Sequence, residues 1–161
     1  MHATAVTVIV VLGFAAQASA DEWSDRSFIV SPDCGHSLTA EDYKDVEVDL
    51  MANFPDDCRP GARTFYLIPT RRDPSTTDGS YIRPLPVGFR PATYGELRAF
   101  GLAYPDVQNH IVVVARGSTW KHPGGAIGVP FLSNTKKGRL LDAINFDWAH
   151  GDNVYNLAVH E

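Results

Sequence analysis

The sequence contains few cysteines, few charged residues and no long apolar run after residue 20. Its 161 residues include only 2 cysteines, and 20% of them are charged. The cysteines lack CxxC spacing and no HxxxH pair is present, so we expect no metal and no cofactor. No segment after residue 20 has membrane-spanning length, which excludes a later membrane anchor. Because 44% of the residues are apolar, the composition is that of a folded globular chain.

The sequence also lacks the short motifs of several enzyme classes. It contains no GxSxG, no P-loop and no GxGxxG, so it gives no sign of a hydrolase elbow or a nucleotide-binding loop. The glycine-rich stretch 124–128 has no following Lys-Ser/Thr and no helix pattern. It therefore predicts a sharp turn between two strands.

The first 20 residues have the pattern of a secretory signal peptide. Residues 6–14 are almost continuously apolar, and small residues at 18–20 fit a cleavage site after Ala20. We expect residues 1–20 to be removed and residues 21–161 to form a single secreted domain. The alternative is a buried N-terminal strand or helix, and the absence of Lys and Arg before residue 20 is the weak point of the secretory interpretation.

Cys34 and Cys58 form an even pair in a chain that is expected to be secreted. In an oxidising compartment such a pair predicts one disulfide. Closing a loop of about 24 residues would stabilise the fold by about 3 kcal/mol in the chain-entropy treatment. Two buried free thiols are the alternative.

Charge is distributed unevenly along the chain. The net charge is −5, but residues 21–57 hold 11 acidic and 2 basic residues, whereas residues 58–140 hold 12 basic and 4 acidic residues. A basic surface binds phosphate backbones whatever the total charge of the protein. The composition therefore allows a nucleic-acid partner that binds at one face.

The pattern of apolar residues predicts an α+β fold. A capping-box spacing at 39–42 and apolar residues at helical spacing predict the main helix over 39–54, and a second capping box at 93–96 predicts a short helix ending at Gly101. We expect the main helix to pack on a curved antiparallel sheet. Its strands are predicted at 28–30, 64–68, 111–115, 127–133, 139–146 and 154–159. Residues 81–91, which contain three prolines, are predicted as an extended segment or an edge strand.

Histidines are the main candidates for acid–base chemistry. His110 directly precedes the apolar strand 111–115, and Arg116 follows that strand on the same face by period-two alternation. General acid–base cleavage of RNA needs two proton-transfer groups and a cation. His110 with His122 or His150 is the candidate set, although exposed or structural histidines are the more ordinary interpretation.

Candidate RNA contacts are Arg116 and the residues of two basic segments. Trp120, Lys121 and His122 stand together, and an aromatic ring beside basic residues can stack a base and contact a phosphate. Lys136 and Lys137 lie in the turn between the two strands that follow. The ordinary alternative for Trp120 is a half-buried anchor of its loop.

Three stretches of the chain resemble the microbial guanyl-specific ribonucleases, and more closely the catalytically reduced RNase-like effectors that plant-pathogenic fungi secrete. They are residues 28–54, the aromatic-then-Gly-Gly loop 117–125, and the hairpin 129–140 with the Gly-Asp-Asn turn at 151–153. The resemblance implies an RNase-like fold and RNA or a host protein as partner. Arg83 is a further candidate contact, because residues 81–83 loosely match the family's Tyr-x-His element.

The catalytic residues that the resemblance implies are not present. Counting from Trp120 places His110 at the family's glutamate, Val129 at its arginine and Phe146 at its histidine. No cysteine follows Cys58, so the family's terminal disulfide is absent as well. We therefore expect a monomeric secreted effector without ribonuclease activity, with entry into host cells left open.

Two other functional classes remain open at this stage. One is an active endoribonuclease that uses His110 with His122 or His150. The other is a protein-binding module whose strand edge, or whose Pro-rich segment 81–91, forms the interface.

Overall fold

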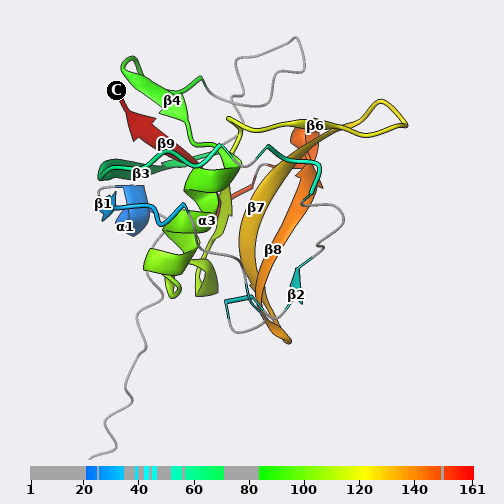
Figure 1. Ribbon diagram of the computed structural model, residues 1–161, viewed down its shortest axis with the longest axis horizontal. Coiled ribbons are helices and arrows are strands. Elements are labelled where there is room, and N and C mark those ends of the chain that lie inside the picture. The colour runs from blue at the N-terminus through cyan, green and yellow to red at the C-terminus, as the bar shows by residue number, and fades with distance from the viewer. Residues whose placement is uncertain are drawn as a thin grey trace, which may run out of the picture.

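The structure is a computed structural model of the chain (Figure 1). It describes residues 21–24, 26–34, 39, 42–43, 45–46, 52–55, 57–70, 84–149 and 151–161. The expected signal peptide at 1–20, Arg83 and His150 lie outside the described residues.

The described residues form an α+β fold with one main helix and one mixed sheet. The strand order is β1-β3-β9-β5-β7-β8-β2, with β4 paired to β9 and β6 paired to β7. The strands are β1 (Ser27–Val30), β2 (Asp45–Val46), β3 (Arg63–Pro69), β4 (Phe89–Pro91), β5 (Val112–Val114), β6 (Trp120–Lys121), β7 (Ile127–Thr135), β8 (Gly138–Asn145) and β9 (Val154–His160). The helices are α1 (Asp21–Ser24), α3 (Tyr94–Ala103) and the 3-10 turns η1 (Val107–Asn109) and η2 (Phe146–Trp148).

The coarse fold class is confirmed, but the sheet is not antiparallel throughout. β5 runs parallel to β9, and β2 runs parallel to β8. The parallel pairing of β5 with β9 arises because the last strand, β9, inserts between β3 and β5 instead of adding to the edge beside β8. The predicted strands at 28–30, 64–68, 111–115, 127–133, 139–146 and 154–159 all contain an observed strand.

The main helix is α3, which the sequence predicted as the short one. Thr93 is its N-cap, and Glu96 completes the capping box by accepting the backbone N–H of Thr93 at 2.9 Å. The predicted end at Gly101 is two residues early. Gly101 lies inside the helix, and glycine is required there by packing, because a Cβ would clash with the Tyr43 hydroxyl.

The predicted main helix over 39–54 is not continuous: none of its described residues is helical, and residues 40–41, 44 and 47–51 lie outside the described residues. The capping signal forms a single turn, in which Asp42 accepts the backbone N–H of Thr39 at 2.8 Å, but Asp45 and Val46 then form β2 on the edge of β8. Helix nucleation alone is unfavourable, and a neighbouring strand offers the backbone its hydrogen bonds instead. Tyr43 is buried beneath the Arg139 guanidinium, and the Phe54 ring lies 5.7 Å from the Tyr94 ring of α3.

Strand alternation divides the core between the two faces of the sheet. The larger cluster lies on the face covered by α3 and includes Phe65, Leu67, Leu97, Phe100, Val113, Leu132, Leu141, Tyr155 and Leu157. The second cluster joins Val114, Val129 and Ala149 with the half-buried Val112, Phe131, Ile144, Phe146 and Val154. Because Val113 and Val114 are neighbours on one strand, these clusters occupy opposite faces.

The long β7–β8 hairpin extends past α3 in both directions (Figure 1). Its turn at residues 135–138 uses Gly138 at φ +120°, a conformation that glycine adopts without strain, as the sequence predicted. At its other end, β6 pairs with the start of β7. The hairpin therefore carries the two predicted RNA-contact segments at opposite ends.

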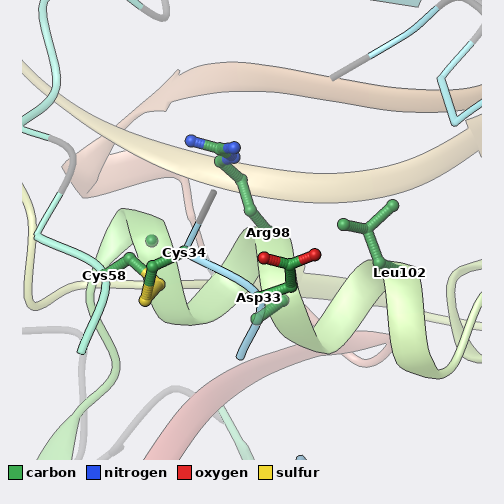
Figure 2. A pocket seen from close by; sticks show the side chains of 7 residues that line it. Asp33, Cys34, Cys58, Arg98 and Leu102 are labelled. Carbon is green, nitrogen blue, oxygen red and sulfur yellow. A yellow bond between two sulfur atoms is a disulfide. The ribbon is translucent and has the colours of Figure 1, made fainter. Parts of the chain in front are cut away.

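The Cys34–Cys58 disulfide is confirmed, and it packs against the first turn of α3 (Figure 2). The Cα atoms of the two cysteines are 5.5 Å apart. The crevice beside the disulfide has a volume of about 10 Å³, enough for one water and no larger ligand. Gly95 allows this close packing, because a Cβ there would stand 2.5 Å from the backbone nitrogen of Cys58.

Gly95→Ala should therefore destabilise the fold by about 2 kcal/mol, the scale of overpacking against backbone that cannot move aside. Urea denaturation with the disulfide intact measures the change. Gly124→Ala is the matched control: its nearest neighbour would lie at 3.7 Å, and we expect a change within about 0.5 kcal/mol. Equal stability of the two variants would contradict the packing argument.

Candidate functional site

An open concavity lies at the β6 end of the hairpin. Eight residues line it: Trp120, His122, Ala126, Ile127, Gly128, Ala143, Ile144 and Asn145. We call it the Trp120 hollow. Its volume is about 250 Å³, slightly below the usual range of small-molecule sites, so it fits one planar ring group rather than a large ligand.

The loop between β6 and β7 positions the two rings of the hollow. The ring centroids of Trp120 and His122 are 4.9 Å apart at an interplanar angle of 64°. The backbone of His122 pairs with Ala126 and Gly125, and Gly125 has φ +90°. This confirms the sharp turn that the sequence predicted at 124–128.

His122 is held in one tautomer when neutral. The backbone N–H of Gly124 donates to its Nδ1 at 3.3 Å, so the ring proton belongs on Nε2. The side chain is otherwise exposed. His122 can therefore offer an N–H donor at the rim of the hollow.

Small residues line part of the hollow beside the indole. Trp120 pairs with Gly128, and a Cβ on Gly128 would stand 3.5 Å from the indole and 3.9 Å from the Ala143 methyl group. Asn145 adds a polar side chain, whose oxygen accepts the N–H of Asp147 at 3.0 Å. The arrangement is an apolar, ring-walled surface with polar groups at one side.

Lys121 lies beside the hollow, whereas Lys136 and Lys137 do not. Lys121 follows Trp120 in β6 and is exposed. Lys136 and Lys137 are exposed in the hairpin turn, about 25 Å away along β7 at the usual rise per strand residue. The predicted RNA contacts therefore form no continuous patch among the described residues.

The structure does not bring His110 and His122 together. His110 follows η1, whose Gln108 and Asn109 side chains bond to Ser133 and Asn134 near the hairpin turn. This places His110 roughly 20 Å from His122 along β7. Its ring instead stacks on Trp23, with centroids 5.7 Å apart.

Arg116 faces the second cluster rather than the hollow. Its guanidinium lies 4.6 Å above the Phe146 ring and donates to the backbone oxygen of Ala149. Val129 and Phe146, where the resemblance would place an arginine and a histidine, both pack in this cluster. The described residues therefore place apolar packing where the resemblance would put a cation and an acid.

The edge strand β1 is a weaker candidate for a protein interface. Ile29 is exposed there, but the Tyr104 hydroxyl donates to its backbone oxygen at 2.9 Å. One of the edge's acceptors is therefore already occupied. Of the Pro-rich segment 81–91, the described part ends in β4, which pairs with β9.

Sequence reasoning missed a charge cluster at the start of α3. Glu96 is fully buried and accepts two hydrogen bonds from Arg90, at 2.8 and 2.7 Å, while Arg63 approaches within 3.6 Å. Burial alone would raise the pKa of Glu96, but hydrogen bonds from Arg90 and Thr93 and the two arginine charges lower it overall. The Glu96 hydrogen bonds in turn raise the pKa of Arg90. The capping box predicted Glu96 as a cap, but no spacing signal joined it to residues 63 and 90.

The described residues contain no cluster of three or more metal-ligating side chains. No helix among them is long and apolar enough to cross a bilayer. Comparison with known proteins found no matching family, no matching curated protein and no matching solved structure.

Glu96→Gln should destabilise the protein by about 3 kcal/mol at pH 7, because it leaves two arginines without their buried partner. The folded-state pKa of Glu96 is lowered, so its contribution is present above its ordinary value of 4.5 and is lost as pH falls through the folded value. Denaturation at pH 7 and pH 3 measures the difference.

The control for this comparison is Glu161→Gln. Glu161 also pairs with Arg90, at 3.2 Å, but its side chain is 68% exposed, so we expect a loss below about 1 kcal/mol. A Glu96→Gln penalty that stays constant down to pH 3 would contradict the electrostatic explanation.

Proposed function

We propose that this is a secreted RNase-like effector-type protein that binds single-stranded RNA at the Trp120 hollow without cleaving it. The observation that carries the proposal is the hollow itself: an indole and an imidazole at 4.9 Å above a floor of small residues. Single-stranded RNA is bound mainly by stacking its unpaired bases on aromatic side chains.

Polar groups around the hollow suit the edges of a base. His122 offers its Nε2–H, and Asn145 offers its NH₂ group because its oxygen is committed to Asp147. The exposed Lys121 supplies a cation for a neighbouring phosphate. These three groups together suit a ligand with a planar ring that forms hydrogen bonds and a neighbouring phosphate that carries negative charge.

Binding without cleavage is supported by the number of proton-transfer groups in the hollow. Of the described residues that line it, His122 alone has a side chain of the kind used in general acid–base catalysis. RNA cleavage by acid–base catalysis needs a second proton-transfer group, and His110 stands roughly 20 Å away. The active-endoribonuclease alternative would need His150 or another residue outside the described part.

The secreted part of the proposal rests on the sequence pattern at 1–20 and on the Cys34–Cys58 disulfide. A disulfide is compatible with an extracellular protein, because cytosolic thiols are kept reduced. The effector-type role rests on the resemblance alone.

Trp120→Ala should weaken binding of a fluorescein-labelled 12-nucleotide oligouridylate by about tenfold or more, since base stacking contributes 1–3 kcal/mol. Fluorescence anisotropy at 50 mM salt measures the dissociation constant. Trp148→Ala is the matched control, because Trp148 is 71% exposed in η2 but does not line the hollow; its affinity should stay within about twofold.

Three results would overturn this function. Absence of RNA binding, or equal losses for Trp120→Ala and Trp148→Ala, would remove the hollow as an RNA site. Shortened oligomer on a gel would show an enzyme instead. Capture of a host protein that depends on Trp120, without RNA binding, would favour the protein-binding class.

Lys121→Ala should reduce the slope of log K against log salt by about 0.7, the value for one phosphate contact on a single strand. For a trinucleotide, the Lys136→Ala/Lys137→Ala double variant should leave this slope unchanged, because the hairpin turn lies about 25 Å away. A loss of slope in the double variant with the trinucleotide would show that RNA binds along the turn and not at the hollow.

A further inference from the structure

The two ends of the Cys34–Cys58 disulfide are not equally accessible. Cys34 is exposed and lies in a segment, residues 31–34, that belongs to no helix or strand. Cys58 is half-buried, and a Cβ on Gly95 would stand 3.0 Å from the Cys58 Cβ, so Cys58 packs on the first turn of α3 (Figure 2). Thiol–disulfide exchange requires an attacking thiolate to reach one of the two sulfurs. Cys34 is the end that solvent can approach.

Local charge does not decide which sulfur is attacked. Arg98 and Asp33 both line the crevice beside the disulfide, so a cation and an anion stand near the same bond. Asp57 also accepts the backbone N–H of Gly95 at 3.4 Å, which offsets the positive end of α3. Because these charges oppose one another, access sets the direction of the exchange.

The disulfide lies over the side of α3 that is turned away from the sheet. Gly95, Ala99 and Leu102 line the crevice together with both cysteines, and a spacing of four and three residues places them on one side of a helix. We call this side the outer face of α3. Phe100 lies on the other side, where its ring packs against Phe65 of the sheet. Ala99 is nevertheless only 8% exposed, and the disulfide forms the opposite wall of its crevice.

The loop between the two cysteines is also held by contacts of its own. β2 pairs with β8, the Phe54 ring lies 5.7 Å from the Tyr94 ring, and Tyr43 is buried. None of these contacts involves a sulfur atom, so they stay in place when the disulfide opens. Breaking the bond therefore removes one link at Cys34 and leaves the core contacts of the loop intact.

We propose that the Cys34–Cys58 disulfide is a redox-sensitive clasp, which a small thiol opens at Cys34 while the rest of the fold stays intact. An oxidising compartment keeps the clasp closed over the outer face of α3, and a thiol-rich compartment opens it and exposes that face. The proposal rests on the disulfide and α3 alone. Success or failure of RNA binding at the Trp120 hollow therefore does not decide it.

The exchange conserves atoms and electrons in two steps. The thiolate of glutathione bonds to the Cys34 sulfur, the protein S–S bond breaks, and its electron pair goes to the Cys58 sulfur, which takes up the proton lost by the attacking thiol. A second glutathione then attacks the sulfur of the first, which releases the Cys34 thiol and oxidised glutathione. Two small thiols are thus oxidised, and the protein disulfide gains two electrons and two protons.

The test treats the full wild-type chain with about 5 mM reduced glutathione, blocks free thiols at intervals and maps the peptides by mass spectrometry. We expect an intermediate with glutathione on Cys34 and a free thiol on Cys58, followed by the dithiol form. Far-ultraviolet circular dichroism should stay constant throughout. Amide hydrogen exchange at residues 95–102 should become about tenfold faster or more, while the β7–β8 amides, the internal control, stay within about twofold.

Cys34→Ala/Cys58→Ala mimics the open clasp and should show the same fast exchange in α3 without glutathione. The wild-type reaction decides the question if this variant does not fold. The proposal is overturned by a disulfide that glutathione leaves unreacted, by glutathione attached to Cys58 instead of Cys34, or by α3 amides whose exchange does not change. Loss of the circular-dichroism signal in step with reduction would also overturn it, because the chain would then unfold and no clasp would open.

Discussion

The buried carboxylate of Glu96 is the contact on which the arrangement of helix and sheet depends. It caps the first turn of α3, binds Arg90 of β4 through both oxygens and approaches Arg63 of β3. A charge removed from water must be matched closely, so these contacts constrain how the three elements pack together. The disulfide packs against the same turn at Gly95, which ties the segment before β3 to the same point.

The two capping-box signals of the sequence show how far local patterns determine this fold. Both predicted a helix, and both form the expected hydrogen bonds at the first turn. Only the turn at Thr93 continues, because Leu97 and Phe100 are buried against the sheet and Glu96 finds its arginines. After Thr39 the chain instead supplies β2 to the open edge of β8. The sequence shows where a helix can be capped. It does not show that a neighbouring strand will form hydrogen bonds with the same backbone instead.

The sequence predicted the part of the candidate site that a single loop forms. It did not predict the parts that depend on contacts between residues far apart in the chain. The loop after Trp120 folds as its glycines indicate, and it carries both rings of the hollow. Spacing along the chain could not show that Lys136 lies at the opposite end of the hairpin, or that β9 inserts beside β5. Strand registers of this kind are set by long-range burial, which a pattern of apolar residues constrains only in part.

The two faces of the sheet hold their arginines in different ways. On the α3 face, the Glu96 carboxylate pairs with Arg90 and lies near Arg63. On the other face, β-branched and aromatic residues surround Arg116 and provide packing but no charge. Val129 and Phe146 stand where the resemblance would place an arginine and a histidine, and both pack in the second cluster, with the Phe146 ring beneath the Arg116 guanidinium. Apolar side chains transfer no proton and stabilise no developing charge, so these two positions do not reproduce the catalytic pattern that the resemblance implies.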